Sequence, residues 1–127
     1  MAESNLEKGR KLRVEVLGKK HVERSFKNAD EFSKPLQDLV TEVGWGVFWS
    51  REGLTLKQRS LLNLGILAVL NRHHELAVHV KGAINNGLTK EEIREALIHV
   101  ACYAGFPATI DAFRTAGKVL DEMGVKD

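Results

Sequence analysis

Three residues near the middle of the chain have types and spacing that could perform chemistry: Arg72, Glu75 and His79. Positions i, i+3 and i+7 share one stripe of an α-helix. A carboxylate one turn from an imidazole can hydrogen-bond the ring, orient it and favour its charged form. The pattern predicts an acid/base, His79 oriented by Glu75, beside an arginine that could hold a substrate carboxylate through two parallel hydrogen bonds. The alternative is a surface salt bridge between Arg72 and Glu75, with His79 as a bystander.

The five histidines also raise the question of a metal site. His73 and His74 are adjacent, and His79 follows His74 by five residues. Five residues turn a helix by about 140°, so His74 and His79 diverge. The H-E-x-x-H pattern of zinc proteases is missed by one residue. The spacing therefore argues against a metal.

Other candidates carry weaker patterns. His21 and Arg24 lie three apart and could face one pocket. Trp45 and Trp49, at i and i+4 beside two glycines, could wall a small-molecule pocket, although such a pair is more often core. Three residues on a later apolar segment are interpreted as core residues: His99, Cys102 and Tyr103.

The elements that must position these residues are helices. Strand-like alternation is weak, and apolar residues recur at helical spacing between glycine, asparagine and proline punctuation. The fold class is predicted as all-α, a single domain over residues 1–127 with six or seven helices. Thr89 with Glu92 matches a capping box, and glycines at 44 and 46 are expected to end a helix. The expected helices span residues 4–17, 21–26, 31–43, 55–70, 72–85, 89–105 and 107–123.

The helix expected at residues 55–70 is apolar around most of its circumference, which in so short a chain indicates contact with another subunit. With 19 basic and 17 acidic residues the net charge is only +2, so nothing indicates nucleic acid as a partner. Neither a signal peptide nor an apolar run of the ~20 residues that span a membrane is recognisable. A cytoplasmic protein is the expectation, without a membrane partner.

Several ordered stretches resemble the 4-carboxymuconolactone decarboxylase (γ-carboxymuconolactone decarboxylase) family, within the superfamily that includes alkyl hydroperoxidase D. The resemblance covers nearly the whole chain, and its specificity comes from the order of the stretches. They are residues 16–24, 45–54, 59–62, 75–80, 83–89, 92–93 and 103–108.

The resemblance implies an all-helical, alkyl hydroperoxidase D-like fold assembled as a homotrimer or homohexamer. The peroxidase branch carries a CxxCxxxH motif. If His79 is its histidine, the two cysteine positions fall on Arg72 and Glu75, and a glutamate of its proton relay falls on Ser60. The redox pair and the relay are both missing, which argues against a thiol peroxidase.

The resemblance further implies cofactor-free decarboxylation of 4-carboxymuconolactone to 3-oxoadipate enol-lactone and CO2, in the degradation of aromatic acids through protocatechuate. On this reading His79, oriented by Glu75, is the proton donor or oxyanion partner. The substrate is expected to be bound by several further residues: Arg72, Arg51, Arg24, His21, Trp45, Trp49 and Tyr103.

This sequence departs from the family at some positions, including residues 109–111, which are Thr-Ile-Asp where a small residue and asparagine are expected, and His99, where glutamine is expected. Two alternatives therefore stay open. One is a paralogue that acts on another small lactone or acid, as an isomerase or a hydrolase. The other is a non-catalytic helical oligomer that binds a small ligand.

Overall fold

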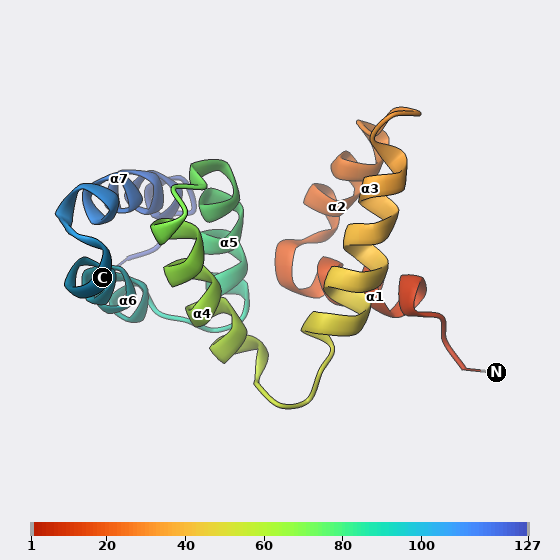
Figure 1. Ribbon diagram of the computed structural model, residues 1–127, viewed down its shortest axis with the longest axis horizontal. Helices are drawn as coiled ribbons and strands as arrows, with labels where there is room; N and C mark the ends of the chain where they lie inside the picture. Colours follow the sequence, from red (N-terminus) through yellow and green to blue (C-terminus); the bar gives the residue numbers. More distant parts are fainter. Residues whose placement is uncertain (1, 127) are drawn as a thin grey trace. The chain divides into compact units, whose positions relative to one another are not determined.

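The computed structural model describes residues 2–126, and the regular elements among them are helices, so the all-α prediction is confirmed (Figure 1). The chain divides into two compact units, Met1–Thr55 and Leu56–Asp127. Within the described residues, no helix is long and apolar enough to cross a membrane. The helices of the N-terminal unit are α1 (Asn5–Leu17), α2 (Lys19–Lys27), α3 (Lys34–Leu39) and the π-helix η1 (Val40–Trp49). Those of the C-terminal unit are α4 (Leu56–Val69), α5 (His73–Asn85), α6 (Lys90–Ala104) and α7 (Phe106–Glu122).

In the N-terminal unit α1 packs closely on η1, and two glycines make this approach possible. A Cβ atom added to Gly9 would clash with the carbonyl oxygen of Thr41. One added to Gly46 would clash with the carbonyl oxygen of Asn5. Both clashes are with backbone, which cannot move aside as a flexible side chain can. Glycine is therefore required at both positions for the two helices to meet.

The expectation that residues 44–46 end a helix is wrong. α3 passes directly into η1, which continues through Gly44 and Gly46 to Trp49 (Figure 1). Glycine costs about 1 kcal/mol of helix propensity, and packing of the segment on α1 outweighs that cost. The sequence pattern reflects the low helix propensity of glycine. The packing that compensates for it is between segments that are distant in the chain.

The start of this helical segment also differs from expectation. Asp30 organises a turn: its Oδ1 accepts a hydrogen bond from the backbone N–H of Ser33 at 2.9 Å. That hydrogen bond holds the pKa of the Asp30 carboxyl below its ordinary range. α3 then begins at Lys34, with Pro35 in its first turn, where proline is tolerated because that N–H has no partner within the helix.

The C-terminal unit encloses a contiguous apolar core supplied by all four of its helices. Leu64, Leu76 and Ile93 are fully buried there, and alanines of α7 allow close packing against them. The short connections explain how α4, α5, α6 and α7 stack into one bundle. Other buried members of the core are Ala68, Val80, Ala83, Leu88, Leu97, Val100, Ala112, Ala116, Val119 and Leu120.

Helix ends in this unit use two kinds of cap. Thr89 and Glu92 form the predicted capping box, with the Thr89 hydroxyl accepting from the Glu92 N–H and the Glu92 carboxylate accepting from the Thr89 N–H. The turn between α4 and α5 places Asn71 at a positive φ of 57°. Its N–H donates to the Ala68 carbonyl and the Arg72 N–H donates to the Leu67 carbonyl, which closes α4 in a Schellman motif.

One side of α6 corrects three expectations. His99, Cys102 and Tyr103 were predicted to be core residues, but all three are exposed. The buried stripe of this helix is Ile93, Leu97 and Val100; the helical repeat places Cys102 on the opposite side and His99 and Tyr103 on the flank. The prediction based on their apolar neighbours in the sequence was therefore wrong about the side of the helix on which these residues lie. The rings of His99 and Tyr103 lie 5.5 Å apart.

Candidate functional site

His79 is the most enclosed of the candidate polar residues, with 8% of its surface exposed on α5. Its Nδ1 atom lies 3.1 Å from the side-chain nitrogen of Asn63, which projects from α4. The two helices meet along much of their length, since they are joined by a short turn and pack side by side. The imidazole is thus positioned by tertiary structure, with a partner 16 residues earlier in the chain.

A second polar contact joins the same two helices. Ser60 is fully buried, and its hydroxyl accepts a 2.8 Å hydrogen bond from the side-chain amide of Asn86 at the end of α5. Because Ser60 and Asn63 are three residues apart, they lie on one side of α4. Together the Ser60–Asn86 and Asn63–His79 contacts form a polar seam between α4 and α5, defined here by these four residues. The seam fixes the register of the two helices around His79.

Glu75, which the sequence predicts to orient His79, lies four residues before it on α5. Glu75 is exposed, and the hydrogen bond to Nδ1 comes from Asn63. Arg72 is also exposed and occupies the N-cap position of α5, with φ −93° and ψ 74°. Its backbone is tied to α4 through the Schellman motif, so the guanidinium extends from a fixed point. Tyr103 is 84% exposed on α6.

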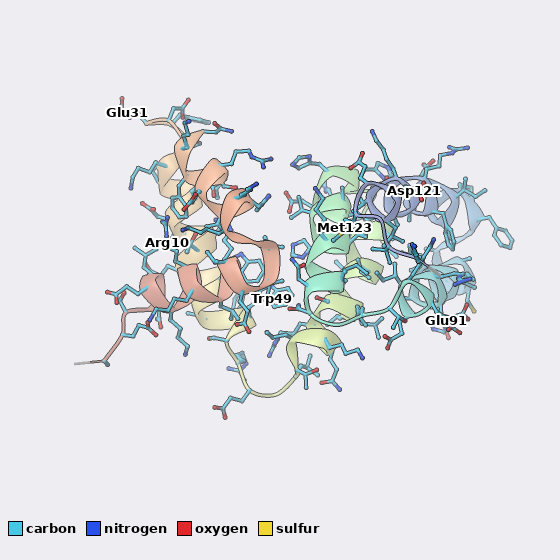
Figure 2. All side chains as sticks on the ribbon, turned by 180° about the vertical axis from the view of Figure 1, so that it is seen from behind. Arg10, Glu31, Trp49, Glu91, Asp121 and Met123 are labelled. Carbon is cyan, nitrogen blue, oxygen red and sulfur yellow. The ribbon has the colours of Figure 1, made fainter. Side chains whose placement is uncertain are left out.

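The remaining candidates belong to the N-terminal unit. Trp45 is buried, and its ring stacks on that of Trp49 at 4.6 Å with a 20° angle between planes, which is an aromatic wall within η1. Trp49 is labelled in Figure 2. His21 is half-buried and Arg24 is exposed, both on α2. Arg51 is exposed just after η1. The aromatic pair is thus brought together by its i, i+4 spacing.

Asn63 and the seam were missed by sequence reasoning. In the sequence, residues 59–62 are informative only through the family resemblance, and Ser60 only as the position of an absent glutamate. An asparagine on a mostly apolar helix was the available signal, because a half-buried amide needs a hydrogen-bond partner. Among residues 2–126, no cluster of three histidine, cysteine, aspartate or glutamate side chains has the geometry to hold a metal ion.

Comparison with known proteins defines the class of protein. The sequence profile of the carboxymuconolactone decarboxylase family matches residues 34–118, and the chain belongs to this family. The match runs from α3 to α7 and includes both the aromatic pair and the polar seam. Together with the named relatives described next, it identifies the chain as an enzyme of the decarboxylase class.

Two curated relatives match almost end to end. The nitrosuccinic acid decarboxylase of Metarhizium robertsii is 46% identical over 92% of this chain and 82% of its own length. The 4-carboxymuconolactone decarboxylase of Acinetobacter baylyi is 39% identical over 97% of this chain and 92% of its own length. The two are named for different substrates and share one reaction type, decarboxylation.

Proposed function

We propose that this enzyme decarboxylates a small dicarboxylic acid in which the carbon that loses CO2 carries an electron-withdrawing group or is linked to one through a double bond. The observation that carries the proposal is the enclosed, hydrogen-bonded His79 in a chain with two decarboxylase relatives. Such a substrate needs no cofactor, because its own electron-withdrawing group takes up the electron pair left by CO2. The protein has to bind the carboxylates, stabilise the new anion and return a proton to carbon.

The first candidate substrate is 4-carboxymuconolactone, with 3-oxoadipate enol-lactone and CO2 as products. Its leaving carboxylate is attached to a ring carbon next to the double bond that is conjugated with the lactone carbonyl. When the C–C bond to CO2 breaks, the electron pair moves through that double bond onto the carbonyl oxygen as a dienolate. Protonation at ring carbon completes the reaction. The relative from Acinetobacter baylyi, which spans nearly the whole chain, supports this candidate.

The second candidate is nitrosuccinic acid, supported by the higher identity to the Metarhizium robertsii enzyme. Here the electron pair left by CO2 is taken up by the adjacent nitro group as a nitronate, and the same carbon is then protonated. Both candidates carry a second carboxylate and both pass through an anion with its charge on oxygen. One site could therefore serve either molecule, with the surrounding side chains deciding which one fits.

The residue roles follow from this shared chemistry. His79 donates a hydrogen bond to the developing oxyanion or the proton to carbon, and Arg72, Arg51 or Arg24 binds the retained carboxylate. His21 is a further candidate for the acid. Glu75 supplies a carboxylate on the same helix as His79, and Tyr103 is a candidate for shaping the pocket. The stacked rings of Trp45 and Trp49 offer an apolar surface, which favours neutral CO2 over a carboxylate.

The experiment that tests the proposal measures CO2 release from each candidate substrate by purified protein, with and without a chelator. His79→Ala should lower turnover by about 10²-fold or more, the usual contribution of a positioned acid or base. His74→Ala is the matched control, since it removes an exposed histidine from the same helix and should leave turnover unchanged.

The products separate the alternatives. Consumption of lactone without CO2 would indicate an isomerase or hydrolase acting on the same ring. No reaction with either compound, combined with a thermal shift on adding small dicarboxylic acids, would indicate a ligand-binding protein. Full turnover in His79→Ala would remove His79 from the mechanism.

We also propose that the enzyme assembles as a homotrimer or homohexamer. Several large apolar side chains of α4 are exposed in the single chain, including Leu62 and Leu70, each at 57%. A soluble protein seldom leaves such a stripe in water, and a second copy of the chain would cover it.

A further inference from the structure

We propose that Asn63 is a positioning residue that holds the neutral imidazole of His79 in one tautomer, with its proton on Nε2. The contact that carries the inference is the 3.1 Å approach of the Asn63 amide nitrogen to Nδ1 of His79. This inference rests on the proposed function for its catalytic consequence. The tautomer itself is a property of the protein without substrate.

The chemistry of the two atoms fixes the direction of the hydrogen bond. An amide nitrogen carries two hydrogens and no available lone pair, so it can only donate. Nδ1 of His79 must therefore accept, which requires its lone pair to be free of a proton. A neutral imidazole has a single N–H, and with Nδ1 unprotonated that N–H is at Nε2.

Local structure limits the freedom of Asn63 to change this arrangement. Its side chain is half-buried on α4, and one turn earlier Ser60 is anchored to α5 through Asn86. The seam thus holds the amide against His79, a residue that is only 8% exposed. Turning the amide round would place its oxygen near Nδ1 and would require the ring to move its proton as well.

An amide at Nδ1 has a different consequence from the carboxylate expected from the sequence. A carboxylate accepts a hydrogen bond from Nδ1–H and favours the doubly protonated cation. The Asn63 amide donates and so supports the neutral ring with Nε2–H. His79 then meets the developing anion of the substrate as a neutral hydrogen-bond donor through Nε2, which stabilises charge on oxygen without a permanent cation in the site.

The test begins with nitrogen-15 NMR of histidine-labelled protein without substrate, at a pH where His79 is neutral. We expect the spectrum of His79 to show Nε2 protonated and Nδ1 unprotonated. Asn63→Asp replaces the donor with an acceptor of nearly the same shape, and should move the proton to Nδ1 or produce the doubly protonated ring. Asn63→Leu removes the donor without adding a charge and should give a mixture of tautomers.

Measurements of kcat and KM provide a second test with the same variants. Asn63→Asp and Asn63→Leu should each lower kcat by about 10-fold or more with little change in KM, because the donor at Nε2 is used in the transition state. Asn28→Asp makes the same amide-to-acid change at an exposed site in the N-terminal unit, and should leave both the His79 spectrum and kcat unchanged.

The outcomes separate this inference from the proposed function. Protonated Nδ1 in the unaltered protein, or a spectrum that Asn63→Asp does not change, would overturn the inference whatever the substrate. If the unaltered protein shows Nε2–H but releases no CO2 from either candidate, the proposed function fails while the tautomer stands. If Asn63→Asp does not fold, the nitrogen-15 spectra of the unaltered protein and of Asn63→Leu still test the tautomer.

Discussion

Arg72 stands at the N-cap of α5 with its backbone fixed by the turn from α4, so its guanidinium is anchored at a defined point two turns before His79. If it binds the retained carboxylate, Arg72→Ala removes a charged hydrogen bond that contributes roughly 1.5–3 kcal/mol. KM should then rise by about 10-fold or more while kcat changes little. Initial-rate kinetics on the better of the two candidate substrates measures this.

Arg94→Ala is the control for Arg72, because it removes an exposed arginine on α6. Arg72→Lys should recover only part of the affinity, since lysine cannot make two parallel hydrogen bonds to one carboxylate. An unchanged KM in Arg72→Ala would transfer the role to Arg51 or Arg24, and the same measurement on those variants would decide between them.

At the scale of residues, the sequence predicts what lies on one helix better than what lies between helices. The stripe of Arg72, Glu75 and His79 follows from helical spacing alone, and α5 has the predicted register. The contact of Asn63 with His79 joins residues 16 apart on two helices, and no periodicity of a single segment encodes it. The packing of α4 on α5 creates this contact, and packing depends on the whole unit.

Among the elements, the close approach of α1 and η1 gives a sharp test. Gly9→Ala would direct a methyl group into the backbone at Thr41, which should destabilise the N-terminal unit by about 3 kcal/mol. Gly44→Ala changes the same η1 segment where the added carbon meets nothing within 4 Å. It should raise stability slightly, by up to about 1 kcal/mol, because alanine favours the helix.

Tryptophan fluorescence is the measurement suited to this pair of variants. Both tryptophans of the chain, Trp45 and Trp49, lie in η1, so their emission during urea unfolding reports on the N-terminal unit. The urea midpoint should fall in Gly9→Ala and stay level or rise in Gly44→Ala. Equal midpoints for Gly9→Ala and the unaltered protein would contradict the packing described for α1 and η1.

The capping box at the start of α6 predicts a dependence of stability on pH. The Thr89 backbone N–H, and then Lys57 at 3.6 Å, hold the pKa of the Glu92 carboxyl below its ordinary value of 4.5. A depressed pKa in the folded state contributes stability that is present above pH 4.5 and is lost as the pH falls through the folded value. Thermal unfolding followed by circular dichroism should therefore show a steeper loss below pH 4.5 in the unaltered protein than in Glu92→Gln.

Thr89 provides the companion variants for this helix start. Thr89→Ala should lower stability by about 1 kcal/mol at neutral pH, because the Glu92 N–H loses the hydroxyl that accepts from it. Thr89→Ser keeps the hydroxyl and should behave like the unaltered protein. A melting curve for Thr89→Ala that matches that of Thr89→Ser would show that the box adds nothing to the stability of α6.

These elements also show which local signals predict structure well. The box at Thr89 depends on side chains and backbone within a few residues, and the sequence predicts it. The helical path through Gly44 and Gly46 was not predicted, because the packing that stabilises it comes from α1, which ends 27 residues before Gly44. Local patterns specify caps and turns, while distant contacts decide whether a weak helix forms.

For the whole molecule, composition and periodicity were sufficient for the all-α class. The division into the units Met1–Thr55 and Leu56–Asp127 has no comparable mark in the sequence, since neither proline nor a low-complexity linker lies at the boundary. Each unit has its own buried residues, such as Val16 and Val22 in the first and Leu64 and Leu76 in the second. Which residues are buried in each unit depends on packing between helices, and the sequence pattern of a single helix contains only part of that information.

The exposed apolar side of α4 predicts that the chain assembles into an oligomer. Leu62, Ile66 and Leu70 recur every four residues and are 57%, 44% and 57% exposed in the single chain. Burial of a large apolar side chain contributes roughly 1.5–3 kcal/mol, and a closed ring repeats that gain in every subunit. Native mass spectrometry should give three or six times the 14.2 kDa of one chain.

Substitution of the stripe links that mass to these residues. The double variant Leu62→Glu with Ile66→Glu should release folded single chains, because carboxylates brought together in an apolar interface repel one another and lose hydration. Met123→Glu introduces an acid at an exposed apolar residue near the end of α7 and should leave the assembly intact (Figure 2). A single-chain mass for the unaltered protein would contradict the proposed assembly, and an undiminished oligomer in the double variant would place the interface away from this side of α4.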